Sequence, residues 1–134
     1  MMEIAKPGVD IGVYVRDIDA MLRFYCDGLG LERTGAVNFP GDRTQHRIAI
    51  GDSVLKLMQF PDGDAPPPAP AGRMAQGGIR YFTIAVRNLP ALVDDLESRG
   101  LHFVVPLRES RPGVWIAMLE DPEGNTVELL DSTA

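Results

Sequence analysis

The sequence predicts an α+β fold built from two tandem modules, each running as a strand, a helix and three further strands. An internal repeat and the matching order of hydrophobic patterns in the two halves carry this prediction. Asp10-Ile-Gly-Val-Tyr-Val-Arg-Asp-Ile-Asp-Ala-Met21 resembles Tyr81-Phe-Thr-Ile-Ala-Val-Arg-Asn-Leu-Pro-Ala-Leu92 at a shift of 71 positions (81 − 10). Ser53-Val-Leu-Lys-Leu-Met58 resembles Asn125-Thr-Val-Glu-Leu-Leu130 at a shift of 72 (128 − 56). Such self-similarity indicates repeated structural units.

The first module is expected over residues 8–60. Apolar and polar residues alternate over residues 9–15, which predicts a half-buried strand. Asp17 or Asp19 can cap the helix that follows, and the two glycines within residues 28–30 can end it. Three more strands are expected at about residues 31–38, 45–51 and 53–60, with Gly51-Asp52 as the tight turn between the last two.

A proline-rich linker is expected over residues 61–77, because this stretch lacks periodicity and proline cannot donate to a strand ladder. The second module then covers residues 78–131 and repeats the order of the first. Its elements are expected at about residues 79–86 (strand), 89–99 (helix), and 102–106, 113–120 and 125–130 (strands).

Composition limits the classes of partner. The chain has 134 residues and a formal net charge of −6, which fits one domain and argues against nucleic acid or an anionic membrane as partner. The charge is compatible with a cationic ligand. The single cysteine, Cys26, excludes an intrachain disulfide and is expected to be a structural thiol. No apolar run reaches the roughly 20 residues of a membrane span, and we expect a cytoplasmic protein.

Two motifs resemble a known family. The run from Asp17 to Leu31, with Phe-Tyr ahead of Gly-Leu-Gly-Leu, and the segment Asp121-Pro-Glu-Gly-Asn-Thr-Val-Glu-Leu129 are similar to the vicinal oxygen chelate superfamily. That group contains glyoxalases, bleomycin-resistance proteins and extradiol dioxygenases, and the resemblance covers about residues 8–131. It implies a single domain of two βαβββ modules whose curved sheets surround a shared cavity, and a homodimer.

In metal-using members, the resemblance implies one ligand from the first strand and one from the last strand of each module. The matching positions are Asp10, Lys56, Tyr81 and Glu128. Strand alternation supports the match, because each lies opposite apolar neighbours that should face the helices. These four residues are therefore expected to contact a ligand on a shared inner face.

The set departs from the usual His, Gln or Glu ligands of the family. Glu128 fits and Asp10 is a capable oxygen donor, but Tyr81 is an uncommon ligand. Lys56 has no lone pair to offer a metal while it is charged. We expect no cofactor; a divalent metal, if bound, would use Asp10 and Glu128. In a structural alternative, the charges form a salt-bridge network that closes an old pocket.

Further side chains on the same strands are expected to line the ligand site: Tyr14, Met58, Thr83 and Thr126. The roles of other polar and aromatic residues are left open by the sequence. His46 and His102 can face a ligand, the surface or the core, and Trp115 suits the core or an apolar wall. Arg16 and Arg87 occupy matching strand ends, where solvated rim positions are expected.

Three functions fit these residues. The first is binding of a small organic molecule, cationic or aromatic, in the manner of a bleomycin-resistance protein. The second is an isomerase or lyase in which Glu128 acts as base beside Lys56 or Tyr81 as electrophilic partner. The third is a metal-dependent glyoxalase or dioxygenase, against which Lys56 argues. The fold does not choose among them.

Overall fold

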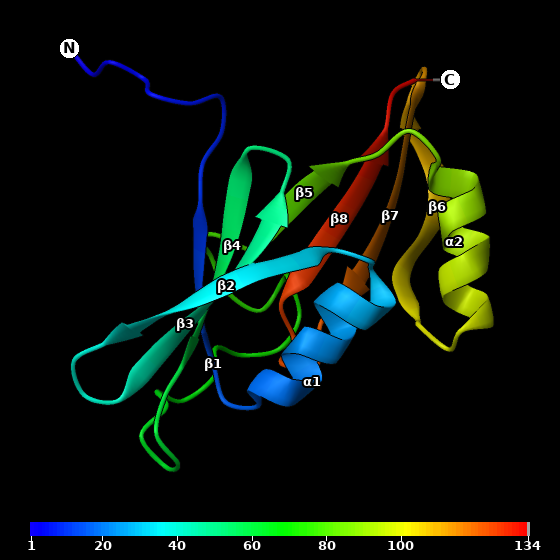
Figure 1. Cartoon of the computed structure of the whole chain (residues 1–134). Coiled ribbons are helices and arrows are strands. Elements are labelled where there is room, and N and C mark those ends of the chain that lie inside the picture. The colour runs from blue at the N-terminus through cyan, green and yellow to red at the C-terminus, as the bar shows by residue number, and fades with distance from the viewer. Residues whose placement is uncertain (134) are drawn as a thin grey trace. The chain divides into compact units, whose positions relative to one another are not determined.

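The chain forms two four-stranded sheets, one in each module (Figure 1). In both modules the elements follow in the same order, which is a strand, a helical segment and three further strands. The computed structural model describes residues 1–133. Backbone contacts divide the chain into two units, Met1–Pro68 and Ala69–Ala134. The first module holds β1 (Ile11–Val15), α1 (Ile18–Leu22), η1 (Arg23–Gly28), β2 (Glu32–Phe39), β3 (Arg43–Ile50) and β4 (Ser53–Gln59). The second holds β5 (Tyr81–Ala85), α2 (Leu89–Ser98), β6 (Phe103–Arg111), β7 (Val114–Glu120) and β8 (Thr126–Asp131).

This order confirms the two βαβββ modules that the repeat predicts. In the first sheet the strands lie in the order β1-β4-β3-β2, and in the second in the order β5-β8-β7-β6. The first and last strands of each module pair in parallel, and the remaining pairs are antiparallel. The two-residue turn at Gly51-Asp52 pairs Ile50 with Ser53, and Gly51 has the positive φ of 55° that such a turn requires.

The first module buries one face of its sheet. Fully or almost fully buried residues on this face are Val15, Ile48, Leu55 and Leu57. Asp17 caps α1, since its side chain accepts a hydrogen bond from the Ala20 N–H at 3.1 Å. From Arg23 the helix widens into the π-helical segment η1, shown by a bond from the Leu29 N–H to the Phe24 carbonyl. Hydrophobic spacing predicts a helix here but does not distinguish these two helical forms.

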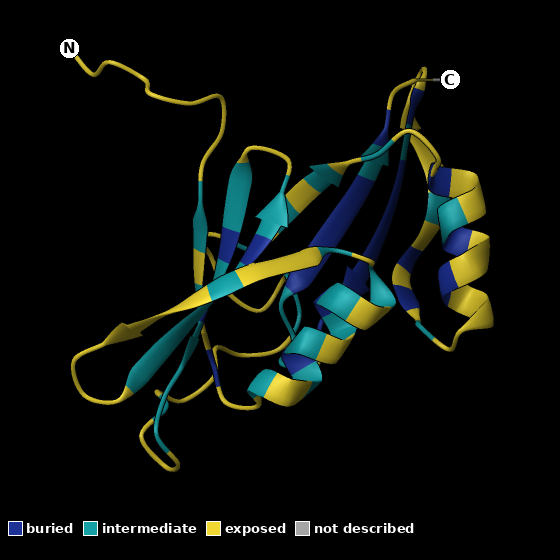
Figure 2. Ribbon diagram, viewed as in Figure 1, coloured by how far each residue is buried: buried dark blue, intermediate teal, exposed yellow. Residues whose placement is uncertain are grey.

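The second module places α2 along β6, β7 and β8. Buried residues recur along one side of this helix (Figure 2) and include Leu89, Val93 and Leu96. The Asp131 carboxylate accepts a hydrogen bond from the Leu89 N–H at 3.2 Å, which ties the start of α2 to the end of β8. The face of β8 that carries Asp131 is therefore the face toward α2.

One strand departs from its prediction. The expected strand at residues 102–106 stops at Pro106, yet β6 continues to Arg111. β6 lies at the edge of its sheet, and its pairing with β7 shifts register between Val105 and Arg108. An edge strand needs hydrogen bonds on one side only, so it tolerates a proline that a central strand would not.

Residues 60–80 contain no helix or strand, which agrees with the composition of the expected linker. No helix within residues 1–133 combines the length and the apolar character that crossing a membrane requires.

Candidate functional site

One face of the first sheet collects the expected residues of the first module. β1 pairs Gly12 with Lys56 and Tyr14 with Met58, and β3 pairs Arg47 with Lys56 and Gln45 with Met58. Residues paired in this way project to the same side of a sheet. This surface, the Lys56 face, lies opposite the buried residues of the same strands and comprises Asp10, Gly12, Tyr14, Gln45, Arg47, Lys56 and Met58.

Asp10 has three close polar partners. Its Oδ1 atom lies 2.6 Å from Nζ of Lys6 and accepts a hydrogen bond from the Val54 N–H at 2.9 Å. Its Oδ2 atom lies 3.6 Å from Nζ of Lys56. The hydrogen bond from Lys6 is the main cause that lowers the pKa of the Asp10 carboxyl. Lys6, which the repeat does not include, is therefore the closer cation of the two.

Aromatic surface lies beside these charges. The rings of Tyr14 and Phe60 meet edge to face with centroids 5.1 Å apart, and Tyr14 remains 60% exposed. Met58 is half-buried on the neighbouring strand. The Lys56 face thus combines cationic groups with an accessible aromatic ring.

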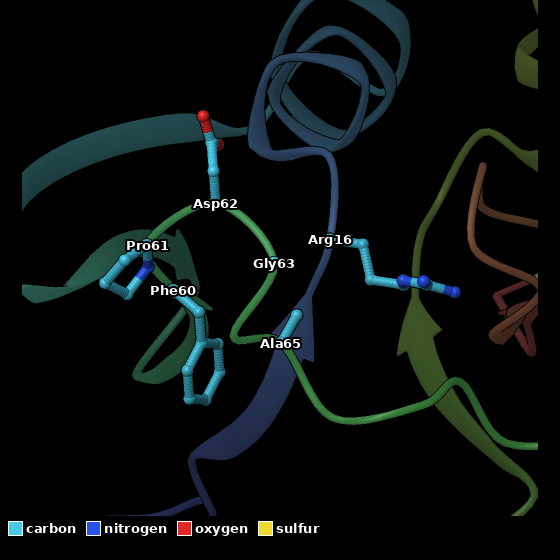
Figure 3. Close-up of a pocket in the computed structure, with 6 residues that line it drawn as sticks. All are labelled: Arg16, Phe60, Pro61, Asp62, Gly63 and Ala65. Atoms are coloured by element: carbon cyan, nitrogen blue, oxygen red, sulfur yellow. The ribbon is translucent and has the colours of Figure 1, made fainter.

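A cavity of about 220 Å³ opens at the end of this region, lined by Arg16, Phe60, Pro61, Asp62, Gly63 and Ala65 (Figure 3). The side chains of Arg16, Phe60 and Asp62 point in different directions there, so the charged groups of Arg16 and Asp62 do not converge. The volume is below the roughly 300 Å³ at which small-molecule sites usually begin. We therefore place the candidate site on the Lys56 face and not in this cavity.

The second sheet arranges the remaining expected residues around Glu128. β5 pairs Tyr81 with Thr126 and Thr83 with Glu128, while β7 pairs Met118 with Glu128. These residues form the Glu128 face, which is turned away from α2 because Glu128 alternates with the residues of β8 that face the helix. Oγ1 of Thr83 donates a hydrogen bond to Oε1 of Glu128 at 2.7 Å.

Glu128 is 9% exposed and Thr126 is 2% exposed, whereas Tyr81 is 50% exposed. An apolar cluster that includes Met118 occupies the same face, with Val105, Val114 and Ile116 as its other buried members. Within residues 69–133, Glu128 has no cation at ion-pair distance. That the Lys56 face and the Glu128 face share one cavity stays a prediction of the sequence.

His46 is placed away from the Lys56 face. It pairs with Leu57 across β3 and β4 and therefore projects to the buried side of the sheet. Its Nδ1 atom accepts a hydrogen bond from Nε of Arg33 at 3.2 Å, so in the neutral ring Nε2 carries the proton and donates to Oε1 of Gln59 at 2.8 Å. These contacts join His46 to side chains of the two neighbouring strands.

The other open residues lie outside the two faces. His102 is exposed ahead of β6, and Arg87 is exposed after β5. Trp115 is half-buried and pairs with Asp131, which places it on the side of α2. Burial is the main cause that raises the pKa of the Cys26 thiol, as expected for a structural cysteine.

Arg47 and Gln45 lie on the Lys56 face, and Phe60 contacts Tyr14 of that face, but none of the three was predicted from the sequence. The signal for two of them was present. A two-residue turn at Gly51-Asp52 fixes the register of the hairpin. Counting outward from Ile50 and Ser53 brings Arg47 opposite Lys56 and Gln45 opposite Met58.

The donor groups of the first module do not fit a divalent metal. Oδ1 of Asp10 is occupied by Lys6 and Val54, and the ammonium group of Lys56 lies next to Oδ2. A metal ion at this carboxylate would meet two cations at close range. Among residues 1–133, no three His, Cys, Asp or Glu side chains form a group that could hold a metal ion.

Solved structures with the same fold are similar to the chain. The structure named SMU.1112c is 23% identical with a TM-score of 0.79, covering 95% of this chain and 99% of that one. TnmS3, an antibiotic binding protein from Streptomyces sp. CB03234, is 21% identical with a TM-score of 0.70, covering 96% of this chain and 98% of that one. Glyoxalase I of Leishmania major, which is trypanothione-dependent, is 22% identical with a TM-score of 0.71, covering 96% of this chain and 88% of that one.

At these identities the likeness shows the fold alone. A search of curated proteins found no match. Residues 9–129, however, match the profile of one large family across both modules. The chain belongs to the Glyoxalase/Bleomycin resistance protein/Dioxygenase superfamily.

Proposed function

We propose that the protein binds a small organic molecule through the Lys56 face, without a functional metal. The proposal rests on the exposure of the Lys56 side chain and on its distance from the nearest carboxylate of the first module. Its side chain is 32% exposed, and its carboxylate neighbour in the first module lies at 3.6 Å, beyond good hydrogen-bond distance. An ammonium group held beside accessible aromatic surface has donors available for a ligand.

The comparisons support the class of function and not the ligand. TnmS3 is an antibiotic binding protein, so at least one protein with this fold binds a small molecule. Transfer of this property to the present chain is part of the proposal. A homodimer and a cytoplasmic location remain expectations from the family resemblance and the composition.

An enzyme is the second candidate, and Glu128 favours it. A carboxylate that is 9% exposed, beside an apolar cluster and held by one hydroxyl, is suited to accept a proton next to a carbonyl group. Tyr81, at the start of the strand that carries Thr83, would then stabilise the developing negative charge.

A thermal-shift screen of small organic compounds, followed by titration of those that raise the melting temperature, tests the proposal. Lys56→Met should weaken binding about tenfold to a hundredfold, because a charge-assisted hydrogen bond contributes roughly 1.5–3 kcal/mol. Arg80→Met is the control, since Arg80 donates to the Ile79 carbonyl at 2.9 Å in the second module. Equal affinity of the Lys56→Met variant and the wild type would refute the assigned role of Lys56.

The two candidates separate by product analysis. Incubation of the selected compound with the protein should leave it unchanged if the protein only binds. Conversion that is lost in Glu128→Gln, with binding retained, would instead establish the enzyme.

A further inference from the structure

We propose that the molecule bound on the Lys56 face is an aromatic organic acid, whose anionic group lies between Lys56 and Arg47. This inference rests on the proposed function and specifies its ligand. The overall charge of −6 is compatible with a cationic ligand, whereas the local charges of the Lys56 face favour an anionic one.

Two cations lie opposite one another on neighbouring strands of the first sheet. Arg47 and Lys56 are direct partners across the antiparallel strands β3 and β4. Side chains at such positions start roughly 5 Å apart at Cβ, and like charges there repel. An anion placed between the two groups would remove this repulsion and satisfy donors on both.

Arg47 has no acidic partner in its module. Its Nη1 atom donates a hydrogen bond to Oε1 of Gln45 at 2.9 Å, and within residues 1–68 no carboxylate lies at ion-pair distance from it. A guanidinium group presents five donors, and one neutral amide oxygen leaves most of them available. Its planar fork suits a carboxylate or a related oxyanion.

Lys56 is likewise incompletely neutralised. The carboxylate beside it, on Asp10, is already bound by Lys6 at 2.6 Å and by the Val54 N–H at 2.9 Å. The remaining contact to Lys56 is 3.6 Å long. Lys6 therefore holds Asp10 and leaves the charge of Lys56 exposed to a ligand.

The aromatic part of the ligand follows from the neighbours of these cations. Tyr14, which is 60% exposed, and Met58 pair across β1 and β4 directly after the pair that contains Lys56. The Tyr14 ring is braced edge to face by Phe60. A flat apolar body one step along the strands from an anionic group would cover this surface.

Three acids, benzoate, phenylacetate and cinnamate, are suitable probes, each with its neutral amide and the corresponding amine. Isothermal titration at low salt should show at least one acid binding about tenfold or more tightly than its amide, with the amine weakest. Added salt should weaken the acid and leave the amide unchanged. Lys56→Met and Arg47→Met should each reduce acid affinity about tenfold, and Arg80→Met should not.

The Asp10→Asn variant shows whether the ligand is an anion or a cation, because the two kinds of ligand should change their affinity in opposite directions. Removing this carboxylate deprives Lys56 of its competing anion, so acid affinity should rise. A gain in affinity cannot come from a misfolded variant. The same change would weaken the binding of a cationic ligand.

Tighter binding of an amine than of its acid, equal binding of acid and amide, or weaker acid binding in Asp10→Asn would each overturn this inference while the proposed binding function stands. If none of the acids, amides or amines binds, the inference is overturned, and the broader compound screen alone then decides the proposed function.

Discussion

Thr83 and Glu128 are direct partners on the parallel strands β5 and β8, and Oγ1 of Thr83 donates a 2.7 Å hydrogen bond to Oε1 of Glu128. The relationship joins two residues that are 45 positions apart (128 − 83) in the sequence. It orients a carboxylate on the face that also carries the apolar cluster around Met118.

Thr83→Val should lower the free energy of unfolding by roughly 1.5–3 kcal/mol, because it removes a hydrogen bond to a charged and buried group. Chemical denaturation measures the change. Thr83→Ser keeps the hydroxyl and is the matched control, with a smaller expected loss. Equal losses in both variants would mean that the hydroxyl does not support Glu128.

Asp121 organises the turn before β8. Its Oδ1 atom accepts hydrogen bonds from the N–H groups of Glu123 at 2.9 Å and Asn125 at 3.0 Å, and Asp121 is 4% exposed. Asp121→Ala should cost about 1–3 kcal/mol of stability, since it leaves these donors without their acceptor. Asp121→Asn retains an oxygen acceptor and should cost less. If denaturation midpoints of the two variants coincide, the bonds to Oδ1 do not stabilise the turn.

The Asp131 carboxylate is expected to stabilise the fold in a way that depends on pH. The Thr133 hydroxyl, followed by the N–H groups of Thr133 and Leu89, lowers the pKa of its carboxyl. A lowered pKa means that the stabilisation is fully present above the unfolded pKa of about 3.9 and is lost as the pH falls through the folded pKa. Asp131→Asn should therefore be less stable than the wild type at neutral pH, and the difference should shrink on acidification.

Melting temperatures recorded from neutral pH down to about pH 3 test this sign, since the stabilisation begins to be lost as the pH falls through the unfolded pKa of about 3.9. A difference between wild type and Asp131→Asn that grows as the pH falls would contradict it.

The protein purified without chelator should carry much less than one zinc, nickel, manganese or iron per chain. The reason is Lys56, which occupies a position where metal-using relatives are expected to have a ligand, and Lys6, which occupies Asp10 at 2.6 Å. Elemental analysis measures the content. Stoichiometric metal that disappears in Glu128→Ala would show that Asp10 or Glu128 binds it after all.

Much of this architecture follows from local sequence patterns. The repeat predicts two equivalent modules, and strand alternation predicts that Lys56 shares a face with Tyr14 and that Glu128 shares one with Thr83, as the strand pairing confirms. Alternation has a period of two, so one correctly placed residue determines the direction of its neighbours.

Other features depend on contacts that no periodicity encodes. The ion pair of Lys6 with Asp10 comes from a segment ahead of β1 that has no counterpart in the repeat. The hydrogen bonds that hold His46 come from Arg33 and Gln59, which reach it from two different strands. The extension of β6 past Pro106 depends on its edge position, which is a property of the whole sheet.

The most direct test of the central claim is a nitrogen-edited NMR titration of the labelled protein with the tightest compound from the thermal-shift screen. The proposed site predicts that the largest amide shifts in the first module occur at Gly12, Tyr14, Arg47, Lys56 and Met58. Shifts in that module confined to the cavity at residues 60–65, or to the buried face around Ile48 and Leu57, would contradict binding on the Lys56 face.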